Sequence, residues 1–250
     1  MKYMLLIYHD EKSWGAISEA ERQGIYADYR KLREELVSRG QWVTGSQLQP
    51  IATATSVRVR EGKRHVTDGP FAETREHLGG YFLIDVKDKQ AAIEVASRIP
   101  GARKGAVEIR QVVEVEGLPT PDRAVDTKQG IQYLLLSYDD EKYWENAGKA
   151  KHLDALGEAV KLTHQMNDKG QYMLAAPLER GNTATTVRIR EGKRLVTDGP
   201  FAETREVLGG FYLINVNNLD EAIEVAGKHP GVRVGTVEIR PVMKISGLPV

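Results

Sequence analysis

The sequence predicts an α+β protein built from two ferredoxin-like units, and three observations lead to this fold class. Residues 1–120 recur at residues 131–250 with a constant offset and no insertion, and an internal repeat of domain size indicates two like domains in tandem. Each copy has the order strand, helix, strand, hairpin, strand, helix, strand, which is a ferredoxin-like plan with one inserted hairpin. A sheet with helices on one face must cover its other face, so we expect an intrachain pseudo-dimer in which the two sheets close an α+β barrel.

The first half of each copy is predicted to form a strand, a helix and a second strand. Residues 1–8 are rich in Leu, Ile and Tyr, as strands are. Ser18 and Glu21 form a capping box that begins a helix, and Gly40 stands where a glycine ends one. A short strand is then expected at residues 41–48.

The second half of each copy begins with a hairpin. Residues 55–60 alternate between valines and arginines, which places the valines on one face of a strand and the arginines on the other. Glu61, Gly62 and Lys63 predict a turn into a second strand. The remaining predicted elements are a strand at 81–86, a helix at about 88–99 that ends before Pro100 and Gly101, and a strand at 106–113.

These elements divide the chain into three parts. Residues 1–116 form the first copy, residues 117–130 form a polar linker with Pro and Gly, and residues 131–250 form the second copy. A short tether of this kind raises the effective concentration of one copy at the other.

The composition excludes several classes of function. Lys plus Arg and Asp plus Glu are both 35, so the chain has no net basic field for nucleic acid. No cysteine is present, which excludes disulfides, thiolate zinc sites and a cysteine nucleophile. The apolar opening is short and runs into charged residues, so it is predicted to be a strand and not a signal peptide. No stretch has transmembrane length, and we expect a cytoplasmic protein with neither nucleic acid nor membrane as a partner.

One motif is identical in the two copies. Val66–Glu76, with the sequence Val-Thr-Asp-Gly-Pro-Phe-Ala-Glu-Thr-Arg-Glu, recurs at Val196–Glu206. Together with the opening Met-Lys-Tyr-Met-Leu-Leu-Ile-Tyr, this motif resembles the YCII-related family in its DGPF-domain branch. The resemblance implies a dimeric α+β barrel with one ferredoxin-like unit per copy. It also implies a link, in some relatives, to extracytoplasmic-function sigma factors.

The wider family is suspected of enzymatic work through a His–Asp pair, and Asp68 and Asp198 look like the matching acids. The histidine does not carry over, because none of the six is repeated and His9 aligns with Asp139. A reaction shared by both copies therefore cannot depend on histidine. A reaction in the second copy alone could use His152 or His164, although a lone histidine on a helix is more typical of a solvated surface.

Asp68 and Asp198 are the predicted catalytic residues, with a structural alternative. An aspartate in a turn usually accepts a hydrogen bond from the N–H two residues later, but here that residue is Pro70, which has no N–H. The carboxylate must reach the N–H of Phe71 or Ala72, which would make it a loop lock, or remain free for function.

Arginines are the predicted ligand-binding residues. Arg58 and Arg60 share one strand face, and Arg75 lies in the motif; their second-copy counterparts are Arg188, Arg190 and Arg205. Guanidinium groups that line a cavity would bind a carboxylate or phosphate. The alternative is a solvated sheet face with cross-strand ion pairs.

Two functions fit these residues. The first is a cofactor-independent enzyme acting on a small organic acid, in which the aspartates move a proton and the arginines hold the anion. The second is a non-catalytic small-molecule-binding or regulatory module. We expect no cofactor and no metal, because a metal-dependent enzyme would need a recurring set of His and Glu ligands and no histidine recurs. The exception would be a hard cation held by carboxylates and waters. The substrate and any further homo-oligomer are left open by the sequence.

Overall fold

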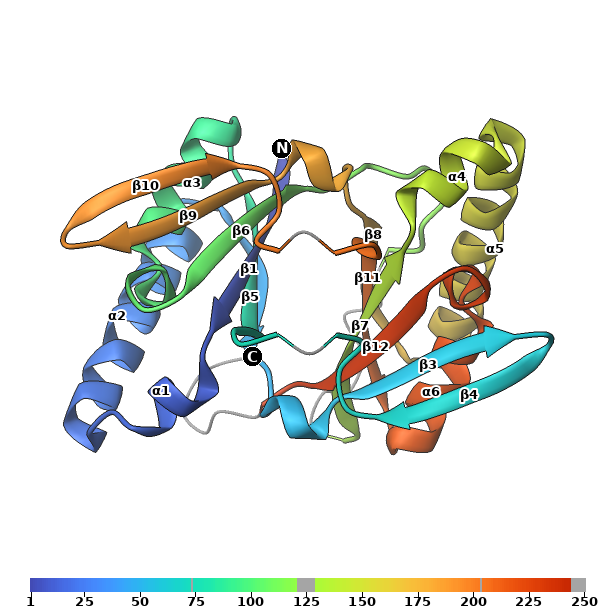
Figure 1. Ribbon diagram of the computed structural model, residues 1–250, viewed down its shortest axis with the longest axis horizontal. Helices are drawn as coiled ribbons and strands as arrows, with labels where there is room; N and C mark the ends of the chain where they lie inside the picture. The colour runs from blue at the N-terminus through green and yellow to red at the C-terminus, as the bar shows by residue number, and fades with distance from the viewer. Residues whose placement is uncertain (73, 121–128, 203, 244–250) are drawn as a thin grey trace. The chain divides into compact units, whose positions relative to one another are not determined.

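Two antiparallel six-stranded sheets organise the computed structural model, which describes residues 1–72, 74–120, 129–202 and 204–243 (Figure 1). The chain divides into two compact units, and each unit contains residues from both sequence copies. Residues 121–128 of the predicted linker lie outside the described residues.

Unit 1 consists of Met1–Leu48, Thr74–Val112 and Glu179–Glu203. Its sheet has the order β10-β9-β6-β1-β5-β2, in which β6-β1-β5-β2 is the ferredoxin-like part. The strands are β1 (Lys2–His9), β2 (Trp42–Gln47), β5 (His77–Asp85), β6 (Ala106–Gln111), β9 (Thr185–Arg190) and β10 (Lys193–Asp198). The helices are α1 (Glu11–Gly15), α2 (Glu19–Ser38) and α3 (Lys89–Arg98), followed by a 3-10 turn, η2 (Pro100–Arg103).

Unit 2 consists of Gln49–Glu73, Val113–Leu178 and Thr204–Val250, and its sheet has the order β4-β3-β12-β7-β11-β8. The strands are β3 (Thr55–Arg60), β4 (Lys63–Asp68), β7 (Ile131–Asp139), β8 (Tyr172–Pro177), β11 (Val207–Val216) and β12 (Thr236–Pro241). The helices are α4 (Glu141–Ala147), α5 (Lys149–Asp168) and α6 (Leu219–Lys228), and the 3-10 turns are η1 (Ile51–Thr53) and η4 (Pro230–Arg233). A further 3-10 turn, η3 (Gly181–Thr183), belongs to unit 1.

Each hairpin pairs with a strand of the other sequence copy. β3 pairs antiparallel with β12, with Val57 opposite Val237, and β9 pairs with β6, with Val107 opposite Val187. The turn of the first hairpin uses Glu61 at φ 52° and Gly62 at φ 73°, as expected for a two-residue hairpin turn that matches strand twist. Each six-stranded sheet is therefore a composite of both copies.

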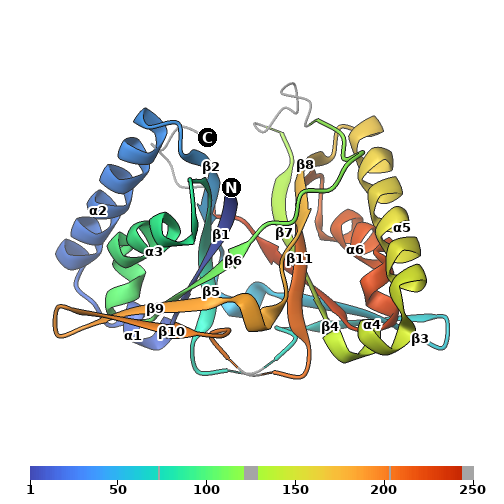
Figure 2. The same ribbon diagram turned by 90° about the horizontal axis from the view of Figure 1, so that it is seen from above.

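The helices cover one face of each sheet (Figure 2), where an apolar core forms. Val107 and Ile109 of β6 belong to the core of unit 1, and Val237 and Ile239 of β12 belong to that of unit 2. Because successive strand residues point to opposite faces, Glu and Arg at the alternate positions of β6 and β12 lie on the sheet face away from the helices.

The predicted α+β class and the two ferredoxin-like units are confirmed, and the barrel is corrected. Each sheet is open, since its edge strands pair on one side only among the described residues, so no closed barrel is formed. The predicted capping box is confirmed, because Ser18 Oγ accepts from the Glu21 N–H at 3.2 Å. Gly40 has φ 66° at the end of α2.

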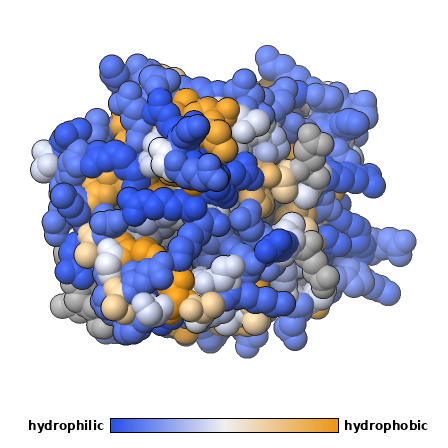
Figure 3. Space-filling model, turned by 60° about the vertical axis from the view of Figure 1, so that its left-hand side comes forward, coloured by the Kyte–Doolittle hydropathy of each residue, from blue (hydrophilic) through white to orange (hydrophobic). Residues whose placement is uncertain are grey.

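None of the helices in the described ranges is long and apolar enough to cross a membrane. The face drawn in Figure 3 is mostly hydrophilic, with separate hydrophobic patches. Isolated exposed apolar residues of this kind are normal for folded proteins.

Candidate functional site

The Asp-Gly-Pro-Phe loop, hereafter the DGPF loop, is fixed at its glycine. In unit 2 the Gly69 N–H donates to the Ala54 carbonyl at 2.8 Å, and Ser56 Oγ donates to the Gly69 carbonyl at 2.9 Å. Gly69 has φ 102°, a conformation that favours glycine. Gly199 in unit 1 repeats both contacts, with Ala184 and Thr186, at φ 103°.

The phenylalanine of the loop contacts the sheet in two ways. The Phe71 N–H donates to Glu238 Oε2 at 2.9 Å, and the Phe71 ring stacks on Tyr138 with centroids 4.0 Å apart. In unit 1 the Phe201 N–H donates to Glu108 Oε2 at 2.7 Å, and its ring stacks on Tyr8 at 4.2 Å. A strand glutamate thus accepts the phenylalanine N–H, which is one of the two that the loop-lock alternative assigned to Asp68 or Asp198.

The glutamate that holds the loop belongs to a buried Glu–Arg pair. In unit 2, Glu238 and Arg240 are 3% and 0% exposed. Arg240 Nη1 lies 3.3 Å from Glu238 Oε1, and its Nη2 donates to the Gln49 carbonyl at 3.0 Å. Its Nε is buried and has no hydrogen-bond partner within the described ranges.

Unit 1 repeats this arrangement. Glu108 and Arg110 are 3% and 1% exposed, and Arg110 donates to Glu108 and to the Glu179 carbonyl. Arg110 Nε is likewise buried without a partner in the part of the chain that the structure describes. An unmade hydrogen bond at a buried donor costs about 1–3 kcal/mol, and the same donor is left open in both units. Each open Nε–H can donate a hydrogen bond to a carboxylate or carbonyl oxygen.

Asp68 and Asp198 lie at the ends of β4 and β10 and are exposed. Their carboxylates make no hydrogen bond or ion pair with the described residues, so they remain free. Asp68 pairs with Thr55 and therefore shares a sheet face with Val57 of the helix-side core. Arg58 lies on the other face, with Glu238. The structure does not bring the predicted acid and this predicted anion-binding arginine together on one face.

Arg58 and Arg188 occupy equivalent positions but make different contacts. Arg58 Nε donates to Thr236 Oγ1 at 2.6 Å, and that hydroxyl donates to Glu206 Oε2 at 2.7 Å. The Arg188 guanidinium instead lies 5.6 Å from the centre of the Phe201 ring. The difference follows from Thr236, which has Ala106 as its first-copy counterpart.

Arg60 and Arg190 hold the 3-10 turns beside their strands. Arg60 Nη1 donates to the Val232 carbonyl at 2.8 Å and its Nη2 to the Gly235 carbonyl at 3.1 Å. Arg190 donates in the same way to the carbonyls of Ala102 and Gly105, both at 2.9 Å. The guanidinium groups are thus engaged in structural contacts in both units.

Arg75 and Arg205 are 88% exposed and pair with the aspartates that cap the short helices α1 and α4. Arg75 Nε lies 3.4 Å from Asp10 Oδ2, and Arg205 Nε lies 3.1 Å from Asp140 Oδ2. The Arg205 guanidinium lowers the pKa of Asp140. A ligand at either arginine would have to compete with this carboxylate.

The structure adds one position that the sequence reasoning missed. Asp139 ends β7, and its Oδ2 accepts from Trp144 Nε1 at 2.9 Å. Burial, followed by the nearby charges of Glu141, Glu206 and Asp140, raises the pKa of Asp139 to about 6 despite the Trp144 hydrogen bond. Its first-copy counterpart, His9, packs beside Trp14 at 5.8 Å. The sequence did hold a signal for this position: His9 and Asp139 are equivalent residues of the two copies, and both are titratable although they differ.

The two histidines considered for a reaction in the second copy have other contacts. His152 stacks on the Trp144 ring at 5.3 Å, and His164 Nε2 lies 2.7 Å from the Gly117 carbonyl oxygen.

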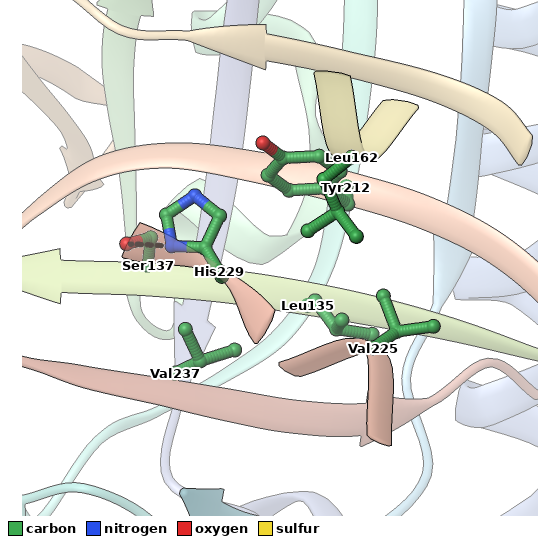
Figure 4. A pocket seen from close by; sticks show the side chains of 7 residues that line it. All are labelled: Leu135, Ser137, Leu162, Tyr212, Val225, His229 and Val237. Carbon is green, nitrogen blue, oxygen red and sulfur yellow. Dashed lines mark hydrogen bonds between the residues drawn. The ribbon is translucent and has the colours of Figure 1, made fainter. Parts of the chain in front are cut away.

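A narrow space between the sheet and the helices of unit 2 surrounds His229 (Figure 4). It is lined by Leu135, Ser137, Leu162, Tyr212, Val225, His229 and Val237. Burial and then the Arg233 charge lower the pKa of His229 to about 4. Its Nδ1 accepts from the Gly231 N–H at 3.1 Å, so the ring has a structural hydrogen bond. The apolar lining makes this space part of the core.

The described residues contain no group of three or more His, Cys, Asp or Glu side chains that could hold a metal ion.

Comparison with known proteins agrees with the repeat. An uncharacterized protein of Rhizobium meliloti (strain 1021), R00369, is 33% identical over 112 residues, which cover 44% of this chain and 90% of that protein. The YCII-related domain matches residues 1–116 and again residues 131–246. The chain therefore belongs to the YCII-related family and carries the family's domain twice.

Proposed function

We propose that the protein is a cofactor-independent enzyme that acts on a small organic acid, within the DGPF-domain branch of its family. One observation carries this proposal: Arg110 and Arg240 each leave a buried Nε–H open at the equivalent place in the two units. An oxygen of a bound acid would satisfy that donor, and guanidinium groups recognise carboxylates well. The DGPF loop is tied to the same Glu–Arg pair through the N–H of Phe71 or Phe201.

In this proposal Asp68 and Asp198, which end the strands that lead into the DGPF loop on the sheet face opposite the Glu–Arg pair, would exchange a proton with the acid at the edge of the sheet. Their free carboxylates support this role, since each is available to a ligand. Arg58, Arg188 and the exposed Arg75 and Arg205 would attract the anion toward the loop, whereas Arg60 and Arg190 would hold the neighbouring turns.

A second candidate is a non-catalytic binding or regulatory module. The exposure of Asp68 and Asp198 favours it, because a carboxylate works best as a general base when burial brings its pKa toward the working pH. This candidate shares the ligand and its anchoring arginines but predicts no turnover.

Two measurements on the full chain separate these candidates. Thermal shift with acetate, malonate, pyruvate and 2-oxobutyrate tests binding, and a ligand at ten times its Kd should add about 1.4 kcal/mol of stability. Proton NMR in D2O then tests whether hydrogens next to the carbonyl of pyruvate or 2-oxobutyrate are replaced by deuterium.

The variants R110K and R240K should weaken binding of the acid. The double variant D68N/D198N should bind the acid as tightly as the unmodified protein but catalyse no exchange. Binding without exchange in the unmodified protein supports the binding module. If none of these acids binds and none undergoes exchange, the proposal is overturned.

A further inference from the structure

The strands β4 and β10 each form one free edge of a sheet (Figure 1). Every residue of both strands is exposed, and in the described part of the chain each strand pairs on one side only, with β3 or with β9. Val66 and Val196, near their centres, are 44% and 46% exposed. An uncovered edge of this kind can pair with a strand of another chain.

The hydrogen bonds of the first hairpin show which backbone groups of β4 face outward. The Gly69 N–H donates to the Ala54 carbonyl, which continues the β3–β4 register. Hydrogen-bonded and non-hydrogen-bonded pairs alternate along an antiparallel ladder, so every second residue back from Gly69 bonds to β3. The N–H and C=O groups of the residues between them, Arg64, Val66 and Asp68, therefore point to the free edge.

These three residues also share one face of the sheet. Val66 lies opposite Val57 of the unit 2 core, so Arg64 and Asp68, two residues to either side, lie on the helix side as well. A Cβ built at Gly227 of α6 would lie 3.0 Å from Arg64 Cδ, so the side chain of Arg64 lies along that helix. Both charged residues are exposed, and neither makes a hydrogen bond or ion pair with another residue in the described ranges.

The order cation, valine, anion is self-complementary in an antiparallel pair. If Val66 lies opposite Val66 of a second chain, Arg64 of each chain lies opposite Asp68 of the other. The outward residues then exchange all their backbone hydrogen bonds, and opposite charges that face each other across two strands stabilise the pair. Centring the pair on Arg64 or on Asp68 would place like charges opposite each other, so the charges select one register.

β10 offers the same edge. Its Gly199 N–H donates to the Ala184 carbonyl, so the outward residues are Arg194, Val196 and Asp198, identical to those of β4. Both charged residues are exposed and make no hydrogen bond or ion pair within the part of the chain that the structure describes. β4 of one chain is therefore complementary to either β4 or β10 of another.

We propose that β4 and β10 are self-association edges, at which a second copy of this chain extends either sheet. Each contact joins two short strands and lies at the low end of interface sizes, so we expect a dissociation constant on the order of 0.1–1 mM. Two such edges per chain allow association to continue beyond a dimer. The inference does not rest on the proposed function. Pairing engages Asp68 and Asp198, so the proposed proton exchange would belong to unassociated chains.

Sedimentation velocity of the full chain from about 10 µM to about 1 mM tests this proposal. The weight-average sedimentation coefficient should rise with concentration, and less so in high salt, because salt screens exposed ion pairs. R64D/R194D leaves two acids on each edge and D68R/D198R leaves two arginines, so each variant alone should associate about tenfold more weakly or less. An equal mixture should recover association, since the acids of one variant then lie opposite the arginines of the other.

The matched control is K63D/K193D. It changes the charge by the same amount, but Lys63 lies on the other sheet face, opposite Gly69 of the partner chain in the selected register, so this variant should associate as the unmodified chain does. V66P/V196P removes an outward N–H and no bond to β3 or β9, and should abolish association.

Thermal melting confirms that each variant is folded. An unmodified chain that stays monomeric at about 1 mM overturns the proposal. So does association that R64D/R194D leaves unchanged, or a mixture of the two charge variants that associates no more than they do separately.

Discussion

An equivalent backbone N–H has a different side-chain acceptor in each unit. In unit 1 the Gly101 N–H donates to the Tyr29 hydroxyl at 3.1 Å. In unit 2 the equivalent Gly231 N–H donates to His229 Nδ1, also at 3.1 Å. The counterpart of Tyr29 is Ala159, and the counterpart of His229 is Ile99. The acceptor has therefore moved from the long helix α2 to the residue after α6.

The ring moved together with the acceptor. Tyr29 meets Phe82 edge-on, with centroids 6.0 Å apart, and His229 meets Tyr212 edge-on at 5.1 Å. The comparison teaches that the copies conserve a hydrogen bond and an aromatic contact, not a residue. It also shows that an unrepeated histidine can be structural, since His229 takes the acceptor role that Tyr29 has in unit 1.

The largest expected effect comes from removing the acceptor in unit 1. Y29A deletes a partly buried ring that packs on the core of unit 1 and leaves the Gly101 N–H unpaired, so we expect a loss of about 3–5 kcal/mol in the free energy of unfolding. Urea unfolding and hydrogen exchange of the Gly101 amide measure it. The double variant Y29A/I99H copies the unit 2 solution and should regain at least about 1 kcal/mol. A double variant no more stable than Y29A would contradict the equivalence.

The second-largest expected effect is a loss of stability of unit 2 at low pH. The pKa of His229 is about 4 in the folded protein and about 6.5 when unfolded, so below pH 6.5 the unfolded chain binds more protons. Stability is fully present above pH 6.5 and declines toward pH 4, by roughly 3 kcal/mol.

Trp144 is the tryptophan of unit 2, so its fluorescence in a W14F/W42F background follows this unit in urea at pH 7.5, 5 and 4. H229I, which restores the residue of the first copy, should remove this acid dependence while lowering stability at pH 7.5 by about 1–3 kcal/mol, because the Gly231 N–H loses its acceptor. If H229I loses as much stability between pH 7.5 and pH 4 as the unmodified protein does, groups other than His229 cause the pH dependence.

A smaller effect of opposite sign is expected at Asp139. Its pKa is raised to about 6 by folding, so its contribution is present below pH 4 and is lost as pH rises through 6. D139N should stabilise unit 2 at pH 8 by about 1–2 kcal/mol, after allowance for partial exposure, and should have little effect at pH 4. The same urea series measures it, with H9N as the control in unit 1. If D139N is less stable than the unmodified protein at pH 8, the ionised Asp139 carboxylate is not unfavourable in the folded state.

The smallest expected effect concerns the contact that only unit 2 has. T236A removes the hydroxyl that joins Arg58 to Glu206, and we expect a cost of about 0.5–1.5 kcal/mol, the usual net value of a hydrogen bond. Urea unfolding at pH 7.5 measures it. The reciprocal A106T offers Arg188 the same partner, and a shift of Arg188 from the Phe201 ring toward the new hydroxyl in a crystal structure would sharpen the comparison.

Local elements were predictable because their signals are local. The strand at residues 55–60 was predicted with the bounds of β3, and the helix that Asp88 caps was predicted at about 88–99 and is α3 at Lys89–Arg98. The short helices α1 and α4 were not predicted, because a few residues capped by Asp10 or Asp140 carry no apolar periodicity.

The candidate site was less predictable. The motif directed attention to Asp68, but the loop's buried partner is Glu238, far away in the sequence. Glu and Arg alternate on the last strand of each copy, yet burial and the open Nε could not be read from that pattern. Burial of a charged pair depends on neighbours that only the folded chain assembles.

By itself, the sequence determined the duplication, the α+β class, the order of elements and the turn of each hairpin, because these follow from periodicity and local backbone preference. Only the tertiary structure decided that the β3–β4 hairpin pairs with β12 and the β9–β10 hairpin with β6. The two hairpins are nearly identical in sequence, as are the strand edges that receive them, so local propensity cannot distinguish the two pairings. That choice is made by long-range hydrogen bonds, which also bring Phe71 to Glu238 and Phe201 to Glu108.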